Sequence, residues 1–313
     1  MGRRAALSVI GSLNTRAALA SVATAVFLLG LKAYATWMTG SVAMLGSLAD
    51  TGLDLLASLV TFIAVRIAAT PADAEHRFGH GKAEALAAMF QVTLISLSAL
   101  AIGYRAVERW IAGAETANAE YGIGVSVIAI IATLVLIVYQ RSVIRRTNSL
   151  AISADNVHYQ SDLLLNASVI AALVIDQYLG FASADPIFGI AIALYLAWGA
   201  FRTARRAVAQ LMDREWADER RDRLIEIANS HPASRGIHDL RTWTSGVDDF
   251  AQFHIWVDPK MTVEEAHRVM DEIERLLLAE FPDTDILIHP DPEGHVEPHG
   301  GVLPVDLARE PQR

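Results

Sequence analysis

The feature that most constrains this chain is a series of long apolar stretches in its first two-thirds. Each is near or above the roughly 20 residues that a helix needs to cross a bilayer. The six stretches run over residues 14–38, 41–66, 83–110, 121–141, 151–179 and 186–208. From Met212 onward the composition becomes charged and alternating. The sequence therefore predicts a membrane-embedded, all-α bundle of six transmembrane helices over residues 1–211, followed by a separate polar domain.

Basic residues are spread unevenly over the connections between these stretches. Lys and Arg occur before the first stretch, between the second and third, between the fourth and fifth, and after the sixth. The connections 39–40, 112–120 and 180–185 contain neither. Because cytoplasmic loops are enriched in Lys and Arg, we expect both termini in the cytoplasm. The net charge of −9 and the pI of about 5.6 argue against nucleic acid as a partner.

Two pairs of polar residues interrupt the apolar stretches. Asp50 and Asp54 lie in the second stretch, and His158 and Asp162 lie in the fifth. On a helix the i,i+4 spacing puts both members of a pair on one face. Charged groups inside a bilayer are unfavourable and usually functional. Polar contacts between helices are the alternative, but two matched pairs favour a metal site.

The donor atoms of this quartet limit the choice of ion. Three carboxylates and one imidazole suit tetrahedral Zn²⁺, and also Fe²⁺, Co²⁺ or Cd²⁺. The chain has no cysteine, which excludes disulfides and thiolate metal sites. Any metal must therefore be held by imidazole and carboxylate groups.

A second group of metal-ligating side chains lies in the connection between the second and third stretches. Asp73, His76 and His80 occur there together with Glu75. Considered alone, the segment is more typical of a solvated loop than of a metal site. The glycines on either side of His80 indicate a constrained backbone.

The polar C-terminal part has the pattern helix, strand, strand, helix, strand. We expect a helix over residues 216–230, strands over 236–244 and 250–258 with a turn at Gly246, and a short strand over 286–289. Thr262 and Glu265 match a capping box that opens the second helix. This order predicts a small α+β domain of the ferredoxin-like type (αββαβ) over residues 212–291. Residues 292–313 are expected to be disordered.

Histidines gather in this predicted domain. His238 and His254 are equally far from Gly246, so a hairpin centred there would place them opposite each other at about 5 Å. His289 and Asp291 would point the same way from the end of the third strand. Surface histidines are the alternative, but this convergence, with His267 from the second helix, favours a metal site.

Two other charged residues lie in the apolar stretches. Asp155 is expected to be solvated at the start of a helix rather than to bind metal. Lys32 is expected to extend along its helix to a membrane interface.

Six short motifs are shared with one family of transporters. They are Thr39-Gly-Ser41, Asp50-xxx-Asp54, Arg77-Phe-Gly-His-Gly-Lys-Ala-Glu84, His158-Tyr-Gln-Ser-Asp162, His238-Asp-Leu-Arg-Thr242 and Leu287-Ile-His-Pro-Asp-Pro292. On these motifs the chain resembles the cation diffusion facilitators, close to the bacterial branch that exports zinc and ferrous iron. The likeness extends over nearly the whole chain. Pro290 is a departure, since relatives often have a polar side chain there.

The resemblance implies an inner-membrane homodimer that exchanges cytosolic metal for protons by alternating access. It implies three metal sites in each subunit: a transport site, a loop site and a binuclear regulatory site in which Asp291 bridges two ions. It also implies that Lys82 and Asp213 interlock near the membrane surface. The implied ligands are Asp50, Asp54, His158 and Asp162; Asp73, His76 and His80; and His238, His254, His267, His289 and Asp291.

Two other functions compete with transport. An intramembrane metallohydrolase would need an open coordination position and a general base, whereas four protein ligands fill a tetrahedron and no HExxH pattern occurs. A scaffold or metal sensor would have no reason to keep an ionisable quartet in the membrane. The sequence therefore predicts a secondary transporter for divalent transition-metal ions, not an enzyme.

Overall fold

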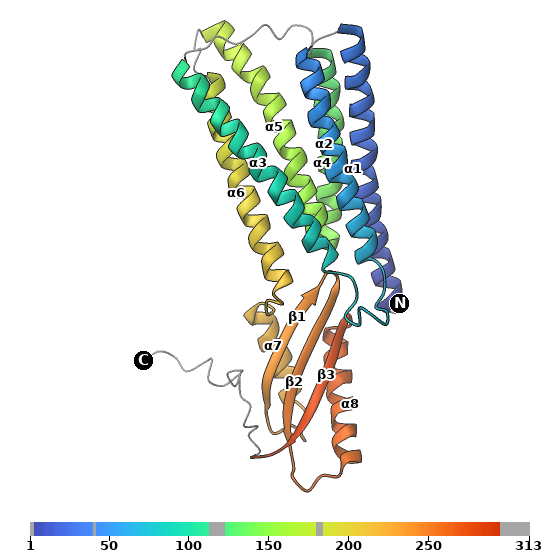
Figure 1. The fold of residues 1–313 in the computed structure, drawn as a ribbon. Helices are drawn as coiled ribbons and strands as arrows, with labels where there is room; N and C mark the ends of the chain where they lie inside the picture. The colour runs from blue at the N-terminus through green and yellow to red at the C-terminus, as the bar shows by residue number, and fades with distance from the viewer. Residues whose placement is uncertain (1–2, 40–41, 113–122, 180–183, 295–313) are drawn as a thin grey trace, which may run out of the picture. The chain divides into compact units, whose positions relative to one another are not determined.

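The computed structural model describes residues 3–39, 42–112, 123–179 and 184–294 (Figure 1). The chain divides into two compact units, one formed by Ala6–Val208 and the other mainly by the chain from Ala209 onward. The first unit is all-helical, and the second contains a three-stranded sheet. Most of the predicted disordered tail, residues 295–313, lies outside the described residues.

In the part of the chain that the structure describes, the first unit contains six long helices. They are α1 (Arg3–Thr39), α2 (Val42–Ala68), α3 (Ala83–Ala112), α4 (Ile123–Thr147), α5 (Leu150–Leu179) and α6 (Ala184–Leu211). Within the described residues, five helices are long and apolar enough to span a membrane, and α5 is not one of them. Asp155, His158 and Asp162 all lie on α5, and these polar side chains lower its hydropathy. The chain is therefore a multi-pass membrane protein with at least five apolar helices.

Small residues let the membrane helices approach closely. Ala17, Ala18 and Ala151 are fully buried where α1 and α5 join a common apolar cluster. A Cβ atom added at Gly189 on α6 would lie 2.8 Å from the Cβ of Ala106 on α3, so only glycine fits there. Because lipid is as apolar as leucine, close packing of small residues is a main source of helix association in membranes.

A buried carboxylate holds the start of α5. The Glu84 side chain, from the first turn of α3, accepts hydrogen bonds from the Ser149 hydroxyl (2.6 Å) and the Leu150 amide (3.0 Å). It also accepts one from the Asn14 side chain of α1 (3.2 Å). Amides in the first turn of a helix have no partner within the helix. Glu84 therefore fixes the N-terminus of α5 against α1 and α3.

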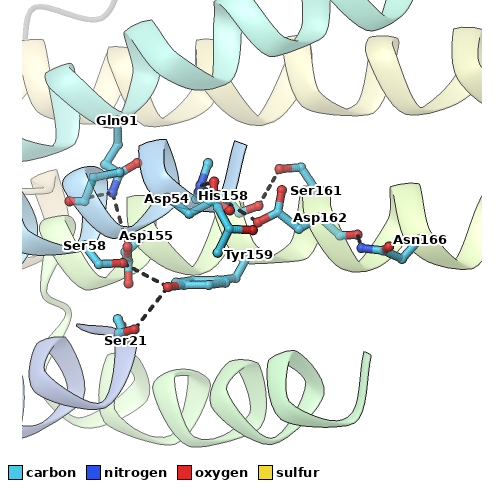
Figure 2. A network of polar contacts seen from close by, with 12 residues as sticks. Ser21, Asp54, Ser58, Gln91, Asp155, His158, Tyr159, Ser161, Asp162 and Asn166 are labelled. Carbon is cyan, nitrogen blue, oxygen red and sulfur yellow. Dashed lines mark hydrogen bonds and ion pairs between the residues drawn. The ribbon is translucent and has the colours of Figure 1, made fainter. Parts of the chain in front are cut away.

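Asp155 corrects one prediction, because it is not solvated but completely buried. Its carboxylate accepts hydrogen bonds from Gln91 Nε2 of α3 (3.2 Å) and from Gln140 Nε2 of α4 (2.7 Å). Figure 2 shows Asp155 and Gln91 with the neighbouring polar side chains. Gln140 also donates to the Ser21 hydroxyl of α1 (2.8 Å). Asp155 thus links four helices one turn before His158.

The second unit follows the predicted order of elements. It contains α7 (Asp218–Asn229), β1 (Ile237–Ser245), β2 (Asp248–Val257), α8 (Val263–Glu280) and β3 (Thr284–Pro292). The sheet order is β1-β2-β3, with β1 and β2 antiparallel and β2 and β3 parallel. Leu224 of α7 and Ile273 and Leu277 of α8 are fully buried against Phe253 and Ile255 of β2. Both helices therefore cover one face of the sheet, and no described helix of this unit covers its other face, called the open face below (Figure 1).

Local signals account for the boundaries of these elements. Gly246 has φ of 67° at the hairpin turn, and Thr262 and Glu265 form both hydrogen bonds of the capping box that opens α8. β3 is longer than predicted and continues through Pro290. Within the described residues, β3 is at the edge of the sheet and pairs only with β2, so the missing amide of Pro290 removes no bond to a further strand there.

Candidate metal sites

Three of the four predicted intramembrane ligands come together between α2 and α5. His158 Nε2 lies 3.0 Å from Asp54 Oδ1 and 3.9 Å from Asp162 Oδ2. One donor atom from each residue lies within 4.8 Å of the other two. Figure 2 shows these side chains converging. Such a cluster has the size and donor set that a divalent transition-metal ion requires.

The side chains of this cluster are largely buried in the helix bundle. The His158 side chain is 8% exposed, and the Asp54 and Asp162 side chains are 21% and 31% exposed. The second ring nitrogen, His158 Nδ1, is buried and has no hydrogen-bond partner in the described part of the chain. The nitrogen that faces the two carboxylates is Nε2, so Nε2 is the donor atom that His158 offers to this cluster.

Asp50 is placed differently from the other three. It lies one turn before Asp54 on α2, is exposed, and does not belong to the group of mutually close donor atoms. The i,i+4 spacing keeps it on the same face of α2 as Asp54. Asp50 is therefore available to complete a tetrahedral site only if its side chain or α2 adjusts.

Tyr159, next to the cluster on α5, ties this helix to two others. Its hydroxyl lies 2.9 Å from the Ser58 hydroxyl of α2 and donates to the Ser21 carbonyl of α1 at 3.2 Å (Figure 2). The ring is 1% exposed. Sequence reasoning missed this role, although the residue adjoins His158 in the motif.

The loop between α2 and α3 brings Asp73, His76 and His80 together. His76 Nδ1 lies 3.4 Å from Asp73 Oδ1, and His80 Nε2 lies 3.4 Å from Asp73 Oδ2. The His80 Nδ1–H donates to the Thr70 carbonyl at 3.3 Å, because a carbonyl can only accept. A hydrogen bond of this kind leaves Nε2 free to bind a metal. Gly79, with φ of 74°, supplies the turn that this loop needs.

The Asp73 carboxylate is also held by backbone amides of its own loop. It accepts hydrogen bonds from the amides of His76 (2.7 Å) and Glu75 (2.9 Å). The bond from the His76 amide, followed by the bond from Glu75 and the nearby histidines, lowers the pKa of Asp73. The carboxylate is therefore ionised at neutral pH, as a metal ligand must be.

The open face of the sheet carries a row of histidines. His238, His254 and His289 are register partners on β1, β2 and β3, which confirms the predicted pairing across the hairpin. Asp291 Oδ2 lies 2.8 Å from His254 Nδ1 and 3.1 Å from His238 Nε2, and Asp291 Oδ1 lies 3.3 Å from His289 Nε2. One carboxylate thus contacts all three rings, and Pro290 does not prevent it.

The position of Asp291 explains its acidity. Burial alone would raise the pKa of this carboxyl, but hydrogen bonds from His254 and His238 and the nearby His289 lower the pKa overall. A carboxylate with two oxygens shared among three imidazoles is a suitable bridge between two ions.

Two residues of this domain differ from expectation. His267 of α8 is exposed, lies 3.2 Å from Asp271, and is not in the group around Asp291. Asp239, which sequence reasoning missed, joins His238 and His254 in a second group of close donor atoms. Its φ of 50° lies at an irregularity in the β1–β2 pairing after His238. In a regular strand the side chains of His238 and Asp239 would point to opposite faces of the sheet. A bulge changes this alternation and can bring the two side chains to the same side.

Comparisons with known proteins identify the family of the chain. Residues 18–212 match the family model described as the cation efflux transmembrane domain, and residues 216–293 match the cation efflux protein cytoplasmic domain. The cation-efflux pumps FieF of Salmonella arizonae and Salmonella typhimurium are each 42% identical to the chain over 282 residues, which cover 90% of this chain and 94% of theirs.

Solved structures also match part of the chain. The zinc form of CzrB, described as a proposed zinc transporter, is 34% identical, covers 27% of this chain and 98% of its own, and has a TM-score of 0.26. A second CzrB structure is 36% identical, covers 25% of this chain and 99% of its own, and has a TM-score of 0.25.

Proposed function

The chain belongs to the cation efflux family of membrane transporters, and we propose that it exports Zn²⁺ from the cytosol in exchange for protons. Fe²⁺, Cd²⁺ and Co²⁺ are further candidate substrates, because nitrogen and oxygen donors accept them as well. The proposed transport ligands are Asp50, Asp54, His158 and Asp162. The observation that carries the proposal is the close cluster of Asp54, His158 and Asp162 within an apolar helix bundle.

The relation between metal and proton follows from ligand chemistry. A metal ion binds neutral imidazole and ionised carboxylate, so its binding displaces protons and protonation expels it. An imidazole ligand such as His158 is suited to this exchange because its unperturbed pKa is about 6.5. We propose that the site opens alternately to the cytosol and to the other side of the membrane, and that protons entering from outside release the ion.

The membrane arrangement is part of the proposal. We propose that α5 is a sixth spanning helix, whose polar side chains face the other helices rather than lipid, as intramembrane polar groups do. The distribution of Lys and Arg supports cytoplasmic termini. The relatives are named as cation-efflux pumps, and we propose the inner membrane as the location.

We further propose that the C-terminal domain senses cytosolic metal and that the protein works as a homodimer. The domain would bind two ions through the row of histidines, with Asp291 as the shared ligand, and His267 would join the site by a side-chain movement. Lys82 and Asp213 would interlock near the membrane surface. The loop group of Asp73, His76 and His80 would be a third metal site.

Reconstituted protein tests the transport site. Asp54→Ala removes a carboxylate 3.0 Å from His158 Nε2. We expect Zn²⁺ flux in proteoliposomes to fall by roughly 100-fold or more, because even the loss of a residue that only supports a ligand costs about 10–100-fold. Glu108→Ala is the matched control, because it removes an exposed carboxylate of α3 that is not in the cluster. Near-normal flux by Asp54→Ala would refute the assignment of the site.

A further inference from the structure

Lys32 of α1 reaches across to α2 rather than extending along its own helix, which differs from the expectation from sequence. Its ammonium group donates a hydrogen bond to Thr51 Oγ1 of α2 at 2.6 Å and another to the Ser47 carbonyl at 3.4 Å. Thr51 is 1% exposed. A cation directed into a membrane bundle is unfavourable unless it has a partner there, so its position needs an explanation.

The neighbours of Thr51 supply that explanation. Thr51 directly follows Asp50 and lies three residues before Asp54, so the ammonium group contacts the helical turn that carries both α2 carboxylates. The lysine thus brings positive charge toward the cluster from a helix that provides no proposed ligand.

We propose that Lys32 is a built-in counter-cation of the transport site, which offsets the carboxylate charge when no metal is bound and competes with the ion when one enters. This inference rests on the proposed transport function. Without an ion, the ionised aspartates repel one another in a region of low dielectric, and a nearby ammonium group reduces that repulsion. With a divalent ion bound, the ammonium group repels it. Both effects weaken binding and favour release.

Substitution of the lysine separates this role from a structural one. Lys32→Met keeps an unbranched apolar stem but removes the charge. We expect it to lower the apparent KM for Zn²⁺ in proteoliposomes by about tenfold, with a lower maximal flux because the ion leaves more slowly. Lys32→Arg keeps the charge and should leave KM within about threefold of the unchanged protein. Arg105→Met, which removes an exposed cation of α3, should not change KM.

The direction of the change in KM distinguishes the proposed role of Lys32 from structural damage. Damage to the bundle would lower flux without tightening KM, so an unchanged or higher KM for Lys32→Met would overturn the inference. A lower KM with both Lys32→Met and Lys32→Arg would also overturn it, because the charge would then not be the cause. Absence of Zn²⁺ flux in the unsubstituted protein would instead refute the proposed transport function.

Thr51 offers a second test if Lys32→Met does not fold. Thr51→Val removes the hydroxyl that accepts the lysine hydrogen bond, and Thr51→Ser keeps it. We expect Thr51→Val to have a lower KM for Zn²⁺ than Thr51→Ser, because the ammonium group is then no longer held beside the carboxylates. Equal KM values for the two variants would overturn the inference.

Discussion

At the scale of single residues, His158 is the side chain that gives the proposed transport site its chemical character. It is the only nitrogen donor in the group with Asp54 and Asp162. Imidazole favours Zn²⁺, whereas a site made only of oxygen donors suits Mn²⁺ or Mg²⁺. The selectivity of the protein should therefore depend on this one ring.

Replacing the ring by a carboxylate tests this dependence. We expect His158→Asp to shift the preference of transport from Zn²⁺ toward Mn²⁺ by roughly tenfold, which corresponds to about 1.4 kcal/mol. Flux with both ions in competition measures the shift. Asn166→Asp is a suitable control, since it adds a carboxylate two turns further along α5 without replacing a proposed ligand. Unchanged selectivity in His158→Asp would exclude His158 as a direct ligand.

Sequence reasoning succeeded at this scale where the partners are close in the chain. The i,i+4 spacing predicts that His158 and Asp162 lie close together on α5, and they lie 3.9 Å apart, whereas Asp50 is outside the group of close donor atoms that contains Asp54. The prediction that Asp155 is solvated was wrong, because its partners Gln91 and Gln140 come from two other helices. The sequence around Asp155 shows a carboxylate near the start of a helix, but it does not show the side-chain amides from other helices that hydrogen-bond this carboxylate.

Lys32 shows the same limit. A lysine in an apolar stretch is expected to extend along its own helix, so that its ammonium group lies in water. The Thr51 hydroxyl that accepts its hydrogen bond lies 19 residues away on α2. Only packing of the two helices reveals that the lysine is directed into the bundle.

At the scale of elements, the C-terminal sheet was predictable because its signals are local. Alternation along β2, the turn at Gly246 and the capping box at Thr262 define the hairpin and the start of α8. The extra length of β3 was missed, because proline normally ends a predicted strand. The irregularity after His238, where Asp239 joins His238 and His254 in one group of donor atoms, has no sequence signal of this kind.

Asp291 on β3 allows a test of the proposed sensing site. Asp291→Ala removes the one carboxylate that contacts His238, His254 and His289, so we expect calorimetry on the full-length protein to show fewer bound Zn²⁺ ions. Transport at saturating Zn²⁺ should persist, with a higher concentration needed to reach it. Asp285→Ala, an exposed position on the same strand, is the control.

Two results would contradict the sensing role. Unchanged Zn²⁺ binding by Asp291→Ala would show that the carboxylate is not a ligand. Loss of transport at saturating Zn²⁺ would show that the C-terminal site is required for transport rather than regulatory, since a regulatory site shifts an equilibrium only through its differential affinity for two states.

At the scale of the whole molecule, the chain combines two units with different chemistry. The membrane unit places carboxylates and one imidazole inside an apolar bundle, and the C-terminal unit places histidines on the open face of a sheet. Family membership establishes cation efflux for the whole chain. The proposed proton exchange would make this efflux active, because it would supply the free energy for moving metal against a gradient.

The most direct measurement of that central claim is Zn²⁺ uptake by proteoliposomes that contain the full-length protein and have an acidic interior. Protons then leave down their gradient, so the account predicts that Zn²⁺ accumulates inside above its external concentration while the interior pH rises. Dissipating the proton gradient with an ionophore should abolish the accumulation but not the equilibration of Zn²⁺. Zn²⁺ entry that only equilibrates, whether or not the proton gradient is present, would contradict the account.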